Sequence, residues 1–282
     1  MLQVALPNKG ALADGAAELV RSAGYQCRRT SRALTVRDAA NEVTFRFLRP
    51  RDIAVYVNNG SLDLGITGRD MLLDSDTALE ELLALGFGKA RFCYAAPAGS
   101  GITTSALDGL RIATSYSRLV AQDLSQRGVA AQLIPLDGAV EVSIQLGAAD
   151  VIADVVQTGR TLEEAGLAII GEPVLETEAI LVSRKQPSDA SDAVRLFIKR
   201  LHGIIVAREY VMIEYDCPKT QLKAASAITP GIESPTIAPL SRPGWVAIKA
   251  MAHRRDINHI LDALEHLGAK GILVTTIETC RV

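Results

Sequence analysis

Apolar residues in the first two hundred positions form short runs that alternate with longer stretches where they recur every three or four residues. Short apolar runs are typical of buried strands, and the longer spacing indicates amphipathic helices. Their alternation predicts an α/β fold in which helices pack on a sheet. The expected strands are 3–6, 44–48, 62–67, 91–96, 111–114, 131–136, 151–155 and 179–183.

The helical stretches between these strands often open with a small or acidic residue, which can cap the free amides of a first turn. Turn signals at 97–101 and at Glu172-Pro173 divide the pattern into two lobes. We expect residues 91–181 to form one lobe and residues 1–90 with 182–207 to form the other. The expected helices are 14–23, 50–58, 116–126, 138–146 and 161–166.

The pattern changes after a polar linker at 185–191, where residues 192–207 are predicted to form one long amphipathic helix. The order of elements beyond it is β-α-β-β-α-β, which matches the ferredoxin-like unit. The sequence therefore predicts a small C-terminal domain at 208–282. Its strands are expected at 210–215, 236–239, 245–251 and 271–277 and its helices at 219–225 and 256–267.

Charge and composition narrow the possible partners. The 30 basic and 32 acidic residues leave a net charge of −2, so no cationic field draws the chain to nucleic acid or to an anionic membrane. The strand-like start without a signal pattern, and apolar runs too short to span a bilayer, favour a cytoplasmic protein. Four scattered cysteines without a Cys-x-x-Cys pair suit reduced thiols better than a disulfide framework or a zinc site.

The segment from Asp154 to Leu162 has the strongest chemical signal in the chain. It follows an apolar strand and precedes a helix, so its amides are expected at the carboxyl end of a sheet, where anions bind. Thr158 and Thr161 add hydroxyl donors, and Gly159 permits a close backbone approach. Asp154 is suited to accept hydrogen bonds from sugar hydroxyls. An ordinary strand-turn-helix with a threonine cap is the alternative for the short motif alone.

A longer pattern is more specific than the turn. It comprises Glu141, Gly147, Ala149, Ile152 and Asp154, followed by Thr158-Gly159 and Thr161-Leu162. This pattern resembles the signature of the ATP phosphoribosyltransferase family, and the similarity extends through residues 7–10, 48–53 and 65–70. Residues 228–236 resemble the long form of that family, which carries its own histidine-sensing domain.

The resemblance implies a catalytic core with the two-lobed type II fold of periplasmic binding proteins, followed by a regulatory domain. It implies transfer of phosphoribose from phosphoribosyl pyrophosphate to ATP, which yields phosphoribosyl-ATP and pyrophosphate in the first step of histidine biosynthesis. Such a displacement passes through a ribose of cationic character, so orientation and charge stabilisation matter more than a strong base. Mg²⁺ is the expected cofactor, bound mainly through substrate phosphates and water.

Family similarity assigns the phosphoribosyl side of the site. Asp154 would hold the ribose hydroxyls, and Glu141 would help to position ribose, pyrophosphate or hydrated metal. A solvated helix carboxylate is the alternative for Glu141. The 5-phosphate would be held by the turn comprising Gln157, Thr158, Gly159, Arg160 and Thr161.

The same similarity assigns the nucleotide side. Lys9 resembles a lysine close to phosphate, and Arg49 with Arg51 resembles a basic pair that meets nucleotide phosphates. Lysine would be more usual at Arg51. Asp70 and Tyr116 would face the nucleotide, although a helix cap and plain packing are the respective alternatives.

The resemblance also implies feedback inhibition by histidine. Its pocket would include Asp216, Thr236 and Gly271, with backbone from 231–234; a strand-to-helix cap and a turn are the alternatives. Because an allosteric ligand must favour one state over another, we expect a homo-oligomer that shifts between active dimers and a less active hexamer.

Three other functions compete with this interpretation. A phosphoribosyltransferase for a free base can carry a similar turn, but the arginine pair argues against it. A two-lobed solute sensor would be expected to carry a signal peptide. A paralogue that binds histidine without turnover would not need Glu141, Asp154 and the whole turn. The four histidines are expected on solvated faces, since they share no metal-ligand spacing.

Overall fold

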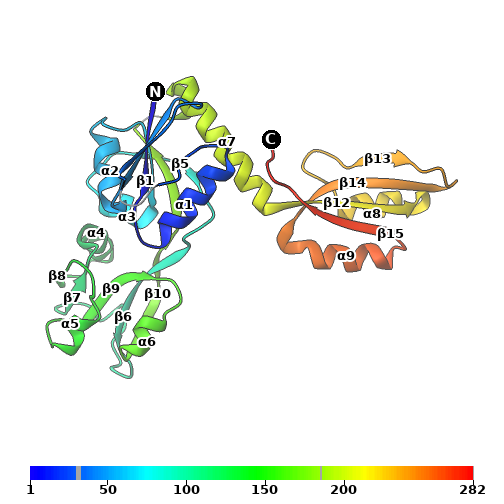
Figure 1. Cartoon of the computed structure of the whole chain (residues 1–282). Coiled ribbons are helices and arrows are strands. Elements are labelled where there is room, and N and C mark those ends of the chain that lie inside the picture. The colour runs from blue at the N-terminus through cyan, green and yellow to red at the C-terminus, as the bar shows by residue number, and fades with distance from the viewer. Residues whose placement is uncertain (30–32, 185, 282) are drawn as a thin grey trace. The chain divides into compact units, whose positions relative to one another are not determined.

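The computed structural model describes residues 1–29, 33–184 and 186–281 and is drawn in Figure 1. The chain folds into two compact units. The first comprises Met1–Arg21 and Tyr25–Leu196, and the second comprises Ser22–Gly24 and the residues from Phe197 onward. The long helix α7 (Asp192–Glu209) contributes residues to both.

The first unit contains two sheets, and the larger one is mixed. Strand β1 lies inside it, parallel to β3 on one side and to β4 on the other, whereas β2 and β11 run antiparallel to their neighbours. The alternation of strand and helix places α1 (Ala11–Ser22), α2 (Pro50–Asn58) and α3 (Arg69–Asp74) directly after β1, β3 and β4. The strand order is β2 (Thr35–Asp38), β3 (Val43–Leu48), β1 (Leu2–Pro7), β4 (Leu64–Gly68), β11 (Ala179–Ser183) and β5 (Glu80–Ala84).

The second sheet is built by the middle of the chain. Strand β7 pairs in parallel with β8 and β9, and β6 pairs antiparallel with β9 and β10. Helices α4 (Ser117–Arg127), α5 (Val142–Gln145) and α6 (Arg160–Glu164) connect these strands. The order is β10 (Leu167–Thr177), β6 (Ala90–Pro97), β9 (Val151–Val156), β7 (Arg111–Thr114) and β8 (Gln132–Pro135).

The chain passes between the two sheets twice, from β5 to β6 and back from β10 to β11. This double crossing gives the two-lobed α/β core that the sequence predicts, of the type II periplasmic-binding-protein kind (Figure 1). The carboxyl ends of β1, β4 and β9 and the end of β10 all contribute residues to one cavity. The residue boundaries suggested for the lobes stay predictions.

The predicted turn at Glu172-Pro173 is wrong. Both residues lie within β10, at an irregularity in its pairing with β6 that falls between Ile170 and Leu175. Gly171 has a φ of +69° there, and β10 is an edge strand. A proline that cannot donate to the ladder is tolerated at such a place.

The predicted helix 138–146 is shorter than expected. Gly138 and Ala139 have positive φ angles of 114° and 50°, which no right-handed helix accommodates. The helix therefore begins after Glu141, which takes the N-cap position, and α5 covers only Val142–Gln145.

The C-terminal sheet has the predicted ferredoxin-like order. Its four strands run β13 (Thr236–Pro239), β14 (Trp245–His253), β12 (Tyr210–Pro218) and β15 (Lys270–Thr276), and each pairs antiparallel with its neighbours. Helices α8 (Leu222–Ile228) and α9 (Ile257–His266) supply apolar side chains to a core with Ile213 and Tyr215. Alternate residues of β12 and β14 are buried, as expected where one face of a sheet is covered.

Two further findings concern the described residues as a whole. None of their helices combines the length and apolar character needed to cross a membrane. Cys27, Cys93 and Cys217 are buried free thiols, and Cys280 is a partly exposed one. Burial raises the pKa of the three buried thiols, which therefore stay protonated and unreactive at neutral pH.

Candidate active site

A cavity of about 440 Å³ lies where the two lobes of the first unit meet. Lys9, Pro50 and Asp70 line it from the lobe of β1, and Tyr116 and Asp154 line it from the lobe of β9. Most of the residues predicted for the site are therefore brought together. Those that line the cavity are Lys9, Asp70, Tyr116, Glu141, Asp154, Gln157, Thr158, Gly159 and Thr161.

The turn after β9 has the geometry of an anion site. Gly159 adopts the left-handed conformation, with φ +81° and ψ −9°, and occupies the N-cap position of α6. The side chains of Thr158 and Thr161 are exposed. Because α6 is a single short turn, the amides and hydroxyls rather than a long helix dipole would bind an anion. Arg160 instead pairs with Glu164 at 2.8 Å and does not line the cavity.

Asp154 lies in β9, paired across the sheet with Cys93. One of its carboxylate oxygens, Oδ1, accepts the N–H of Val155 at 2.8 Å. Burial raises the pKa of Asp154 above its ordinary value, and the charge of Glu141 adds to the rise. The pKa of Asp154 rises because water is withdrawn from its charged form and a second carboxylate lies nearby. This carboxylate is thus an acceptor poised for hydroxyl donors.

Asp70 is 5% exposed and is held from the opposite lobe. Thr177, the last residue of β10, accepts the backbone N–H of Asp70 at 3.0 Å and donates its hydroxyl to Oδ1 at 2.6 Å. Gly68 makes room for this arrangement, since a Cβ there would lie 2.4 Å from Asp70 Oδ1. No local sequence signal reveals Thr177, because it is 107 residues from Asp70.

If Asp70 faces the nucleotide, as the family resemblance implies, Gly68→Ala is expected to raise the KM for ATP about fivefold, since the new methyl group would displace Asp70 from its hydrogen bonds with Thr177. Gly68 has a φ of −87°, so alanine brings no backbone strain of its own. Steady-state kinetics of this variant provide the measurement. Two further variants are compared with it: Thr177→Val, which removes the hydroxyl, and Thr177→Ser, which keeps it. An unchanged KM for ATP in Gly68→Ala and Thr177→Val would remove Asp70 from the nucleotide side.

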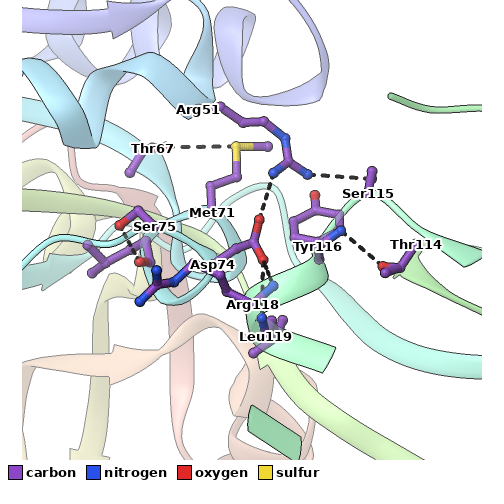
Figure 2. A network of polar contacts seen from close by, with 11 residues as sticks. Arg51, Thr67, Met71, Asp74, Ser75, Thr114, Ser115, Tyr116, Arg118 and Leu119 are labelled. Carbon is purple, nitrogen blue, oxygen red and sulfur yellow. Dashed lines mark hydrogen bonds and ion pairs between the residues drawn. The ribbon is translucent and has the colours of Figure 1, made fainter. Parts of the chain in front are cut away.

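Figure 2 shows Tyr116 and Arg51 side by side. The guanidinium carbon of Arg51 lies 4.2 Å from the centroid of the Tyr116 ring, and Phe92 meets that ring edge to face at 5.2 Å. Tyr116 is 6% exposed, and burial, with the nearby charge of Asp70, raises the pKa of its phenol. The phenol therefore stays neutral and can serve as a stacking face.

The basic residues predicted for the site differ in their surroundings. Lys9 lies between β1 and α1 and lines the cavity. Arg49 is exposed at the N-cap of α2, and Arg51 forms an ion pair with Asp74 at 2.8 Å. Neither arginine lines the cavity in this structure.

The cavity is acidic. Its lining in the described part of the chain contains four carboxylates, Asp70, Glu141, Asp154 and Glu178, against the single cation Lys9. A polyanionic substrate would therefore meet net repulsion unless it arrived with cations of its own. These carboxylates suit the hydroxyl groups of a sugar, which can donate hydrogen bonds to them.

The residues predicted for regulation occupy two places in the second unit. Thr236 lines a hollow of about 370 Å³ with residues that include Gly231, Ser234, Lys249 and Met251. Asp216 lies instead beside Gly271, whose added Cβ would be 4.0 Å from Asp216 Oδ2. Thr236 therefore lines this hollow, whereas Asp216 and Gly271 are not among its lining residues.

The fold and the cavity define a two-lobed α/β protein in which a turn with the geometry of an anion site lies at the carboxyl end of a strand, inside the cavity between the lobes. The family model for ATP phosphoribosyltransferase matches residues 49–203, and the model for the C-terminal domain of the same family matches residues 207–279. The chain belongs to the ATP phosphoribosyltransferase family. Its reaction is thus a pentosyl transfer in the first step of histidine biosynthesis.

The chain is similar in sequence to named relatives over its full length. The chain is 60% identical to an ATP phosphoribosyltransferase of Salinibacter ruber and 53% identical to one of Mycobacterium tuberculosis, and both alignments cover 100% of each chain. Among solved structures, the ATP phosphoribosyl transferase (HisG:HisZ) complex of Thermotoga maritima matches with a TM-score of 0.64 at 28% identity. That match covers 73% of this chain and 98% of the other.

Proposed function

We propose that the chain transfers phosphoribose from phosphoribosyl pyrophosphate to ATP within the cavity between the lobes, with Mg²⁺, under inhibition by histidine. The adenine ring nitrogen beside the 6-amino group forms the new bond to the anomeric carbon as the bond to the pyrophosphate oxygen breaks. The observation that carries the proposal is the meeting of Asp154, Asp70 and most of the turn in one cavity, the turn residues being Gln157, Thr158, Gly159 and Thr161.

Different groups of the chain bind the two substrates. Backbone amides and threonine hydroxyls of the turn bind the 5-phosphate, and Asp154 accepts hydrogen bonds from the ribose hydroxyls. On the other side, Asp70 and the face of Tyr116 orient the nucleotide. Holding both reactants in line lowers the barrier without a strong base, since the ribose carries the developing positive charge.

Assay of the purified chain with both substrates tests this proposal directly. We expect pyrophosphate and phosphoribosyl-ATP to form in equal amounts with ATP, and no transfer with free adenine. Transfer to adenine, or no product with ATP, would favour a different phosphoribosyltransferase or a binding protein.

Mg²⁺ fits the oxygen-rich lining of the cavity. Among the described residues no group of three or more His, Cys, Asp or Glu side chains is arranged to hold a metal ion. Asp154 and Glu141 offer carboxylate oxygens, which Mg²⁺ prefers, usually together with substrate phosphates and water. When bound, the metal would neutralise the leaving pyrophosphate.

Excess EDTA is therefore expected to lower turnover by about a hundredfold or more, and added Mg²⁺ to restore it, because one lysine cannot offset the acidic lining. The melting temperature of the substrate-free protein should not change with EDTA or Mg²⁺, since the proposed metal arrives with substrate. Full turnover in excess EDTA would contradict the proposed metal requirement. A large thermal shift with Mg²⁺ alone would instead indicate a site formed by the protein.

Histidine inhibition rests on the attached βαββαβ domain and on the family to which it belongs. We expect histidine to lower turnover and to shift the mass from dimer to hexamer. The variant Asp216→Asn should weaken inhibition about tenfold, since a charge-assisted hydrogen bond to a cationic amine is lost. Asp262→Asn, an exposed carboxylate on α9, serves as the matched control. Unchanged turnover and mass with histidine would refute the proposed regulation.

A further inference from the structure

Asp74 makes three contacts beside the cavity, two of which link its lobe to α4 in the other lobe (Figure 2). It is the last residue of α3, and its side chain is 12% exposed. Its Oδ1 atom accepts the backbone N–H groups of Arg118 at 3.0 Å and Leu119 at 3.1 Å. Its Oδ2 atom accepts a hydrogen bond from Nη1 of Arg51 at 2.8 Å.

Two of these contacts replace a missing helix cap. The first amides of a helix have no partner within the helix and are usually satisfied by the N-cap side chain. Tyr116 occupies the N-cap of α4 with φ −124° and ψ 60°, and its side chain makes no capping bond. Asp74 supplies the acceptor from the other lobe, more than forty residues away in the chain. The start of α4 is thereby fixed, and Tyr116 is fixed with it.

The third contact orients Arg51. The backbone at the start of α2 is already tied, because Thr67 donates its hydroxyl to the carbonyl of Pro50 at 2.8 Å. Asp74 then directs the guanidinium over the ring of Tyr116, 4.2 Å from its centroid. The guanidinium stacks on the aromatic face, pairs with Asp74 through Nη1 and donates from Nη2 to Ser115 Oγ at 3.4 Å, and these contacts together set its orientation.

The neighbouring Arg118 side chain does not compete for the carboxylate of Asp74. The side chain of Arg118 turns away to Asp76, with its Nη2 atom 2.7 Å from Oδ1. Ser75 closes the end of α3 by donating its hydroxyl to the carbonyl of Leu72 at 2.6 Å, which holds the backbone beside Asp74. One carboxylate therefore satisfies the α4 amides and the Arg51 cation together.

We propose that Asp74 is a positioning residue of the transfer reaction, which sets Arg51 in its own lobe and Tyr116 in the opposite lobe for the nucleotide. Asp74 does not line the cavity and touches no reacting atom. This inference rests on the proposed function, because it assumes that Arg51 and Tyr116 serve the nucleotide. Its expected signature is a selective loss of ATP recognition with phosphoribosyl pyrophosphate recognition retained.

The test compares Asp74→Asn with the matched control Asp76→Asn, an exposed carboxylate two residues away whose side chain is 83% exposed. Asparagine keeps an oxygen for the α4 amides but loses the charge that holds Arg51. We expect Asp74→Asn to raise the KM for ATP about tenfold and to leave the KM for phosphoribosyl pyrophosphate within about twofold, as for loss of one charge-assisted hydrogen bond. Asp76→Asn should leave both constants unchanged.

A double-mutant cycle with Arg51→Ala separates positioning from general destabilisation. Once Arg51 is absent, Asp74→Asn should add little to the KM for ATP, because the two side chains act through one contact. Additive effects, an unchanged KM for ATP, or equal losses for both substrates with a lower melting temperature would each overturn the proposal. Failure of the wild-type protein to form phosphoribosyl-ATP would refute the proposed function itself, and this inference with it.

Discussion

Replacing Asp154 with asparagine is expected to lower kcat/KM for phosphoribosyl pyrophosphate by about a hundredfold or more, as when a preorganised group of a transition state is removed. The neutral amide keeps an oxygen for the Val155 N–H, so the fold should be retained. It cannot accept hydrogen bonds from two ribose hydroxyls with the strength of a carboxylate. Steady-state kinetics with each substrate varied in turn measure the effect.

The same substitution is expected to raise thermal stability at pH 7. The folded pKa of Asp154 lies above its unfolded value of about 3.9, so the folded state binds more protons in the window between the two. Stability therefore falls as the pH rises through that window, and asparagine removes this cost. The melting temperature of Asp154→Asn should exceed that of the wild type at pH 7, and the difference should shrink as the pH falls toward 4.

Asp150 provides a control in which the pKa shift has the opposite sign. Its pKa is lowered by the hydrogen bonds that it accepts from Arg111, whose Nη2 atom lies 2.7 Å from Oδ1. Such a carboxylate contributes stability above its unfolded pKa, and that contribution is lost as the pH falls through its folded pKa. Asp150→Asn should thus lower the melting temperature slightly and retain activity. Wild-type kinetics in Asp154→Asn would remove Asp154 from the active site.

A second large effect is expected at Gly159. An L-residue in the left-handed region costs on the order of 1–2 kcal/mol, so Gly159→Ala should shift the turn and raise the KM for phosphoribosyl pyrophosphate about tenfold. An added Cβ at Gly159 would meet open space, so the effect would arise from the backbone and not from a clash. The KM for ATP should change little.

Gly166 is a matched control for Gly159. Its φ is +71°, its added Cβ would also meet open space, and it lies outside the lining of the cavity. Gly159→Ala and Gly166→Ala should lower the melting temperature by similar amounts, but only the first should weaken substrate binding. Equal KM values in the two variants would show that the turn does not contact the 5-phosphate.

The bounds of β7, β11 and β13 are those expected from the sequence. β11 is an apolar run buried at every residue, whereas β13 is exposed at every residue, so burial alone does not decide how well a strand is predicted. Three strands were not predicted: β2, β5 and β10. Strand β5 begins with two exposed glutamates, and β2 and β10 lie at sheet edges, where polar residues and a proline are tolerated. Their pairing depends on neighbours distant in the chain.

The candidate site was predicted where its residues are contiguous. Asp154 and the turn 157–161 form one local motif, and Asp154, Gln157, Thr158, Gly159 and Thr161 line one cavity, whereas Arg160 pairs with Glu164 outside it. Thr177 and Asp74 were missed, because they act on Asp70, Arg51 and the α4 amides only through tertiary contacts. Arg51 was predicted for its charge, but its ion pair with Asp74, a residue of the same lobe, comes only from the packing of α2 beside α3.

A crystal structure of the protein with bound phosphoribosyl pyrophosphate and Mg²⁺ tests the central claim most directly. We expect the 5-phosphate to accept hydrogen bonds from the amides and hydroxyls of residues 158–161, and the two ribose hydroxyls to donate to Asp154. A ribose bound away from Asp154, with its phosphate on other residues, would contradict the account.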